Sequence, residues 1–187
     1  MFLLSACDVI DTDNGLLANL VPPEDAALPA VPLTEANMMR GKLTLLPPSG
    51  YCIDPNSLTQ NFALMARCDK LGASEGGSGA PVGVLSVSLA RSAKDTAMPT
   101  AQEIVTAAGL TEPKNVRQSD NNVVFKATGN APSTDFSSAH WRSMTKFNGF
   151  TMSAALYGPK DQRAVSSEGA SVLEDMINRT ISKTNAS

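Results

Sequence analysis

The side chains of this chain that could do covalent or metal chemistry are few: three cysteines and one histidine. A structural zinc site needs about four nitrogen or sulfur ligands, and Cys52, Cys68 and His140 cannot supply them. No Cys-x-x-Cys pair is present, so a thioredoxin-like redox centre is not expected. The sequence therefore predicts no metal site and no cofactor.

The sequence also gives little indication of a catalytic serine nucleophile. One segment resembles a nucleophile elbow, Gly76-Gly77-Ser78-Gly79-Ala80, but an alanine occupies the position of the final glycine. The segment lies in a glycine-rich loop, whereas an elbow joins a strand to a helix. We therefore expect a protein that is not an enzyme. The alternative is a periplasmic hydrolase whose site is built around His140, with a serine and a carboxylate brought beside it by the fold.

The overall charge restricts the class of partner. Lys and Arg total 15 against 18 for Asp and Glu, which gives a net charge of -3, and the charges form no blocks. A dedicated nucleic-acid binder needs clustered cations to displace the counterions of the phosphates. Nucleic acid is therefore not expected as a partner. No run of about 18 apolar residues is present, so no helix of this sequence is expected to span a bilayer.

The cysteine nearest the N-terminus follows a step of small residues, Leu4-Ser5-Ala6-Cys7. This step resembles the lipobox of bacterial lipoproteins, in which an aliphatic and two small residues precede the cysteine that is lipidated. The resemblance implies cleavage before Cys7, acylation of its thiol and attachment to a lipid bilayer. A signal peptide also needs a cationic region and about 7–15 apolar residues, and only residues 2–4 are available for it here. We therefore expect a longer precursor with a basic, apolar leader.

The number of cysteines agrees with acylation of Cys7. An odd count in an oxidising compartment leaves one thiol free or bridged to another chain, and a thioether-linked lipid removes that thiol. Residues 1–7 are assigned to the signal-peptide remnant and lipobox. Residues 8–39 contain four prolines and no sustained hydrophobic period, which predicts a flexible tether with an r.m.s. span of roughly 30 Å. The expected location is the bacterial cell envelope, with the folded domain in the periplasm.

Beyond the tether, residues 40–187 are expected to form a single α+β domain. Its architecture would be an antiparallel β-sheet with a middle helix and a C-terminal helix packed on it. The residue patterns predict strands over 41–46, 51–53, 62–71, 84–89 and 122–127, a helical turn over 57–62, a capped helix over 100–109 and an amphipathic helix over 166–183.

The clearest pattern is that of a β-hairpin around Asn148-Gly149, a dipeptide that supplies the positive φ angles of a type I′ turn. A two-residue loop pairs Phe147 with Phe150 and places alternate residues on one face. The apolar face is assigned to the core and carries Trp141, Phe147, Phe150, Met152 and Leu156. The opposite face is polar and slightly basic, and is the predicted docking surface for a protein partner: His140, Arg142, Lys146 and Tyr157.

The order of these elements, from about residue 40 to residue 182, is similar to the PsbP-like fold, in which a closing helix follows the last hairpin. The resemblance implies an extrinsic, non-enzymatic module that docks on a larger assembly, and it assigns no functional residue to this chain. Together with the lipobox, it leads us to expect a membrane-anchored envelope lipoprotein that is a binding or accessory subunit of a membrane assembly.

Cys52 and Cys68 are predicted to form a disulfide. Both lie in short extended segments that flank a turn, and their separation in the chain is ample for a bridge. Closing a loop of that length contributes about 3 kcal/mol of stability by the chain-entropy estimate. The alternative is two buried free thiols, which are common in cytosolic cores.

Overall fold

The structure, a computed structural model, describes residues 30–186 with the exception of 75, 78, 93–95 and 112. One compact unit spans Val31–Ser187. The lipobox, its cysteine Cys7 and most of the expected tether lie outside the described residues, so the interpretation of residues 1–29 stays a prediction.

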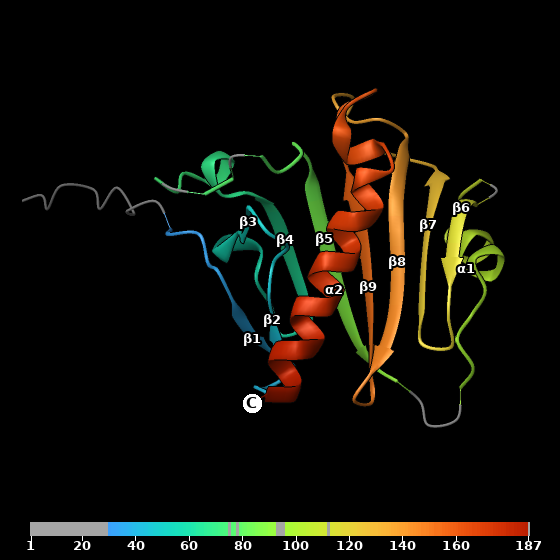
Figure 1. Ribbon diagram of the computed structural model, residues 1–187, viewed down its shortest axis with the longest axis horizontal. Coiled ribbons are helices and arrows are strands. Elements are labelled where there is room, and N and C mark those ends of the chain that lie inside the picture. The colour runs from blue at the N-terminus through green and yellow to red at the C-terminus, as the bar shows by residue number, and fades with distance from the viewer. Residues whose placement is uncertain (1–29, 75, 78, 93–95, 112, 187) are drawn as a thin grey trace, which may run out of the picture. The chain divides into compact units, whose positions relative to one another are not determined.

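A seven-stranded antiparallel sheet forms the centre of this unit, with the spatial order β3-β4-β5-β9-β8-β7-β6 (Figure 1). A separate two-stranded sheet pairs β1 with β2. The strands are β1 (Ala36–Met38), β2 (Leu43–Leu45), β3 (Tyr51–Ile53), β4 (Phe62–Arg67), β5 (Val84–Arg91), β6 (Lys114–Gln118), β7 (Asn122–Thr128), β8 (Ala139–Phe147) and β9 (Phe150–Tyr157). The helices are α1 (Ala101–Ala107) and α2 (Glu168–Ala186), with short 3-10 turns at Pro55–Ser57, Cys68–Leu71 and Arg163–Val165. The α+β class is confirmed.

The β8–β9 hairpin has the predicted register. Phe147 pairs with Phe150, and Trp141 lies opposite Leu156. The two turn residues, Asn148 and Gly149, have φ angles of 47° and 75°, which are the left-handed values that a type I′ turn requires. The hairpin therefore places Trp141 and the side chains aligned with it on one face of the sheet, as expected.

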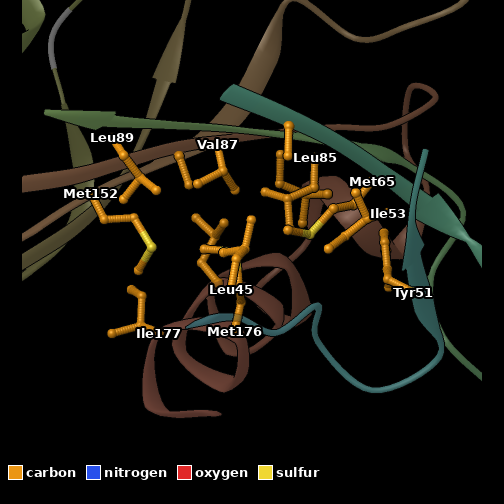
Figure 2. Close-up of a cluster of buried hydrophobic side chains, with 14 of the residues drawn as sticks. Leu45, Tyr51, Ile53, Met65, Leu85, Val87, Leu89, Met152, Met176 and Ile177 are labelled. Carbon is orange, nitrogen blue, oxygen red and sulfur yellow. The ribbon is translucent and has the colours of Figure 1, made fainter. Parts of the chain in front are cut away.

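That face carries the main core, beneath α2 (Figure 2). Alternate side chains of β5 point toward the helix, because successive residues of a strand face opposite sides of the sheet. Leu85, Val87 and Leu89 are at most 3% exposed, and Figure 2 shows them opposite the α2 side chains Met176 and Ile177. The core is mostly aliphatic and methionine-rich, as the small share of aromatic residues predicts.

The N-terminal end of α2 is fitted closely against Trp141. The indole Nε1 donates a hydrogen bond to the carbonyl oxygen of Ser166 at 2.6 Å. At Gly169 a Cβ atom would overlap both the carbonyl oxygen of Ala164 and the indole ring. Only glycine therefore allows the first turn of α2 to approach the sheet this closely.

The other end of α2 is joined to the small sheet. The hydroxyl of Thr180 accepts a hydrogen bond from the Leu46 amide at 3.1 Å and donates one to the Leu46 carbonyl oxygen. The hydroxyl of Thr184 accepts one from the Thr44 amide at 3.2 Å. Two threonines near the end of the chain thus complete the backbone bonding of β2 and the residue after it.

The folded domain begins earlier than predicted, so the boundary at residues 39 and 40 is wrong. Leu33 and Ile53 exchange two backbone hydrogen bonds of 3.0 and 2.8 Å, and both apolar residues of β1, Ala36 and Met38, are buried. The pattern missed them because β1 is three residues long. A strand of three residues is too short to show an alternation of apolar and polar side chains.

Two further expectations are wrong in their bounds, and one strand was not expected. The strand predicted over 62–71 ends at Arg67, because Cys68–Leu71 form a 3-10 turn. The helical turn expected over 57–62 lies earlier, at Pro55–Ser57, where the Asp54 side chain accepts a hydrogen bond from the Asn56 amide. Strand β6 was not predicted, because all five of its side chains are exposed and show no hydrophobic alternation.

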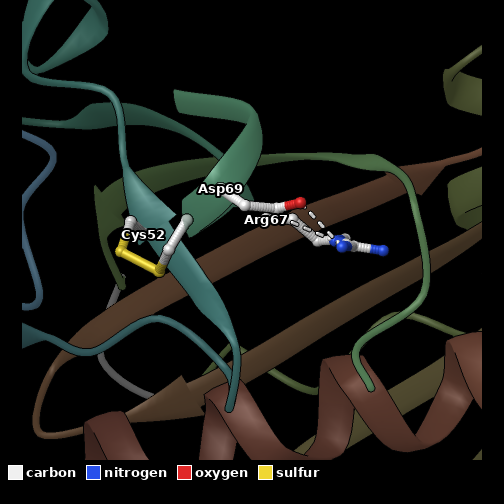
Figure 3. Close-up of a disulfide and its surroundings, with 4 residues drawn as sticks. Cys52, Arg67 and Asp69 are labelled. Carbon is white, nitrogen blue, oxygen red and sulfur yellow. Dashed lines mark hydrogen bonds and ion pairs between the residues drawn. A yellow bond between two sulfur atoms is a disulfide. The ribbon is translucent and has the colours of Figure 1, made fainter. Parts of the chain in front are cut away.

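The predicted disulfide is present between Cys52, on β3, and Cys68, the first residue of the 3-10 turn that follows β4 (Figure 3). Beside it, the Arg67 guanidinium donates two hydrogen bonds to Asp69, from Nε at 2.9 Å and from Nη2 at 2.7 Å. This pairing holds the pKa of the Asp69 carboxyl below its usual range. The bridge ties the edge strand β3 to the turn that follows β4.

Candidate functional site

The second face of the sheet is covered only in part by the described residues. Helix α1 packs on β7, where Val123 and Phe125 join Val105 in a second apolar cluster, whereas Val124 faces the core under α2. The two helices therefore lie on opposite faces of the sheet. The start of α1 is set by a capping box, in which Thr100 and Glu103 each accept a hydrogen bond from the other's amide.

A groove of about 690 Å³ lies between α1 and the neighbouring strands β5, β9 and β8. Its volume falls within the range of about 300–1,000 Å³ that is typical of binding sites for small ligands. Side chains that project from the strands on this face include Ser86, Ser88, Arg142, Met144 and Ser153, and the helix side contributes Met98, Ile104, Ala107 and Ala108. The groove thus combines apolar walls, serine hydroxyls, one guanidinium and the carboxylate of Glu103.

Arg142 is the charged centre of this face. Its Nε donates a hydrogen bond to His140 Nε2 at 3.0 Å, and its Nη2 donates one to the Tyr157 hydroxyl at 3.1 Å. Within the described part of the chain, Arg142 forms no ion pair. Two neutral acceptors therefore hold the guanidinium in place without compensating its charge.

His140 is the buried residue that accepts the hydrogen bond from Arg142 Nε. Its side chain is fully buried, Nδ1 lies 2.9 Å from the carbonyl oxygen of Ser138, and the ring stacks on Tyr157 with centroids 4.5 Å apart. This arrangement assigns the proton to Nδ1 and leaves Nε2 as the acceptor for Arg142. Burial and, to a smaller extent, the charge of Arg142 lower the pKa of His140.

We expect the histidine ring, the only one in the chain, to titrate below the usual value of about 6.5 in an NMR pH titration. Folding favours the neutral form of the ring. The contribution of His140 to the free energy of unfolding is therefore largest above about pH 6.5. This contribution is lost as the pH falls from about 6.5 through the lowered pKa, because the unfolded chain then binds the proton more readily.

The variant His140→Gln keeps an acceptor but cannot titrate. The stability advantage of the wild type over this variant should shrink between about pH 8 and pH 5, and a ring that titrates at or above 6.5 would contradict the assignment.

The predicted docking residues differ in how exposed they are and in whether they line the groove. Arg142 lines the groove, Tyr157 is half-buried, and Lys146 is half-buried and donates hydrogen bonds to the carbonyl oxygens of Thr96 and Ala97 at 2.7 and 2.8 Å. The expectation of an exposed His140 is wrong. Its alternation in the strand indicated the correct face, but the ring of Tyr157 covers it there.

The groove itself was not predicted, although the sequence carries part of its pattern. In β5, Ser86 and Ser88 alternate with the buried leucines and valine, so their side chains face the second side of the sheet. The position of α1 above that side has no local pattern in the sequence, because it depends on the packing of Val105 against β7. The wall and the floor of the groove come from separate parts of the chain.

The hydrolase alternative finds no catalytic arrangement around His140. Both ring nitrogens are engaged, by the Ser138 carbonyl oxygen and by Arg142, and no hydroxyl or carboxylate of a described residue bonds to the ring. A nucleophile activated by a histidine needs such a contact. Ser78, from the segment similar to a nucleophile elbow, lies outside the described residues.

Neither a cluster of metal-ligating side chains nor a membrane-spanning helix is present in the part of the chain that the structure describes. Nowhere in that part of the chain do three His, Cys, Asp or Glu side chains gather in a way that could hold a metal ion. None of its helices has the length and the apolar composition needed to cross a membrane.

Comparison with solved structures identifies the fold. The Ran-binding protein Mog1p of Saccharomyces cerevisiae aligns with a TM-score of 0.51 and 11% identity, over 80% of this chain and 94% of that one. The chain shares a fold with Mog1. A point mutant of Mog1 gives the same TM-score and identity, over 79% of this chain and 95% of its own. Cyanobacterial PsbP from Synechocystis aligns with a TM-score of 0.44 and 12% identity, over 82% of this chain and 94% of that one.

No protein-family model and no curated protein sequence matches the chain. The PsbP-like resemblance of the element order stays a prediction. The likeness to Mog1 concerns the fold alone, since one fold serves many functions.

Proposed function

We propose that this protein is a lipid-anchored accessory subunit of a bacterial envelope assembly, and that its domain binds a segment of a protein partner in the groove between α1 and the sheet. The observation that carries the proposal is the guanidinium of Arg142, which lines the groove, is held by two neutral groups and has no acidic partner among the described residues. The proposed role is non-enzymatic.

The arrangement of Arg142 favours recognition over catalysis. An arginine fixed before binding loses little side-chain freedom on contact with a partner, which makes it suited to be a binding hot spot. His140 and Tyr157 supply that fixation, and neither of them is free to act on a substrate. The apolar side chains of Met98, Ile104 and Met144 offer surface that a partner can bury.

The disulfide supports the envelope location. Disulfides persist in oxidising compartments and are rare in the cytosol of most organisms, and Cys52 and Cys68 are bridged. The lipobox-like step at Cys7 supplies the proposed anchor. Several acyl chains, each contributing about 0.8 kcal/mol per buried methylene, would give lasting attachment, whereas a single chain gives only marginal binding.

The likeness to Mog1 adds a limited argument. The yeast protein is described as Ran-binding, so a domain of this fold is used there to bind another protein. At 11% identity neither that partner nor its contact surface transfers to this chain. The partner proposed here is instead a component of the membrane assembly that the anchored domain can reach.

One experiment in cells tests both halves of the proposal. The complete gene is expressed with a photo-crosslinking amino acid at Ala107, on the exposed helix wall of the groove, and the membrane and soluble fractions are separated. The wild type should be in the membrane fraction, with an acylated Cys7 in its N-terminal peptide, and should crosslink to one partner. Cys7→Ser should move the protein to the soluble fraction.

Two tryptophan variants separate groove binding from general contact. Ser88→Trp places a large ring on the floor of the groove and should remove the crosslink. Ala90→Trp makes the same change two residues along the same face of β5, outside the groove lining, and should leave the crosslink intact. A wild type in the soluble fraction would refute the anchor, and a crosslink that survives Ser88→Trp would refute docking in the groove.

A further inference from the structure

We infer that the groove selects its bound segment by a carboxylate: Arg142 pairs with an aspartate or glutamate side chain of the partner, flanked by aliphatic residues. This inference rests on the proposed function, because it names the chemistry of the segment that the groove would hold.

The donor geometry of Arg142 supports this choice. A guanidinium carries five N–H donors, and Arg142 uses one on Nε and one on Nη2 for its bonds to His140 and Tyr157. The remaining three belong to the two terminal amino groups and have no acceptor among the described residues. The two terminal amino groups form a fork that fits both oxygens of a carboxylate.

The other charges at the groove do not compensate Arg142. Among the described residues that line it, Arg142 is the only lysine or arginine, and Glu103 is the only acid. The Glu103 carboxylate accepts hydrogen bonds from the Thr100 amide at 2.7 Å and from the Thr100 hydroxyl at 2.9 Å. These bonds hold the pKa of Glu103 below its usual range and keep it at the start of α1. The groove therefore presents a cation that an incoming anion can neutralise.

The surroundings of Arg142 indicate what accompanies the carboxylate. Met144 lies two residues along β8 on the same face, and Ile104 and Met98 line the opposite wall. Methionine side chains adapt to the shape of an aliphatic partner. A segment with leucine-like residues beside its acid would bury these walls while the charges pair in a partly desolvated setting, where pairing is stronger than in bulk water.

A segment of a protein fits the groove better than a free small acid. Ser88 and Ala107, on its floor and on its helix wall, are both exposed, so the groove is open to solvent and does not enclose a ligand. The serine hydroxyls of β5 and β9 can bond to the amides of an extended chain. The occupant that we propose is therefore an extended acidic segment of the partner.

Peptide libraries provide a direct test. The full chain is immobilised and offered acetylated, amidated heptapeptides with Leu at the third and fifth positions and otherwise random flanks, with either Glu or Gln at the centre. We expect the Glu library to be retained at least about tenfold more than the Gln library. Arg142→Gln should abolish this preference, whereas Lys160→Gln, which removes an exposed cation outside the groove lining, should preserve it.

A second variant guards against misfolding of Arg142→Gln. Tyr157→Phe keeps the ring that stacks on His140 and removes only the hydroxyl that holds the guanidinium. It should reduce the preference for Glu severalfold while far-UV circular dichroism stays unchanged.

The remaining outcomes separate this inference from the proposed function. Equal retention of both libraries that is lost in Ser88→Trp would overturn carboxylate selection and leave groove docking intact. A preference for Glu that survives Arg142→Gln would also overturn it. If neither library binds but hexanoate shifts the amide resonances of Ser88 and Ala107, the occupant is a small acid, and the inference is overturned. Failure of the docking proposal itself would appear in the cellular crosslink.

Discussion

Trp141→Ala is expected to lower the free energy of unfolding by about 3–5 kcal/mol, the usual cost of removing a large aromatic side chain from a core. Trp141 is 1% exposed, and its indole ring packs between the sheet and the first turn of α2. Its removal leaves a cavity under Gly169, whose missing side chain had made room for the indole ring. It also leaves the Ser166 carbonyl oxygen without its hydrogen bond.

Urea denaturation of the wild type and of Trp141→Ala measures this loss. Phe147→Ala is the matched control, because Phe147 is an aromatic residue on the same face of the same strand but is only half-buried. Phe147→Ala should lower the free energy of unfolding clearly less than Trp141→Ala, since part of the Phe147 side chain is already in contact with water. Equal losses for the two variants would contradict the role assigned to Trp141 as the contact between the sheet and α2.

Removal of the disulfide by the double substitution Cys52→Ala and Cys68→Ala is expected to cost about 3 kcal/mol, since the unfolded chain regains the freedom of the closed loop. Both cysteines are at most 6% exposed, so alanine avoids leaving buried hydroxyls. Because this freedom belongs to the unfolded chain, the loss should appear in the free energy of global unfolding, measured by urea denaturation.

The reduced wild type is the internal control for this prediction. Its stability should match that of the double alanine variant, because both lack the same bridge and little else differs. Non-reducing mass spectrometry of protein from an oxidising compartment should find no free thiol at either position. A double variant as stable as the oxidised wild type would show that the bridge does not constrain the unfolded chain.

The hairpin could be predicted in detail because its turn has specific chemistry. Asn148 and Gly149 tolerate the left-handed backbone angles that few other residues adopt, and one turn then determines the register of two strands. The disulfide was predictable for a similar reason, since it depends on residue types and spacing. Where a residue type itself determines the geometry, a single sequence is sufficient.

The features that were missed have no pattern in the local sequence. Strand β6 has five exposed residues, and only its backbone bonds to β7 make it a strand. The buried state of His140 follows from its stacking on Tyr157, which lies on the next strand. The groove requires α1 to sit over β7 and leave β5 open. None of these arrangements has a periodicity that the local sequence could reveal.

The two threonines of α2 that bond to β2 and Leu46 also bear on how the domain is made. They join residues 134 and 140 positions apart, and contacts of such long range slow folding. Part of the apolar face of β5 and β9 therefore stays uncovered until the 19-residue helix α2 has been made and has packed on the sheet. We therefore expect this domain to fold as one unit, and only once α2 is available, with its apolar surface exposed to chaperones until then. A premature stop before α2 would leave no domain at all, rather than a domain that lacks one helix.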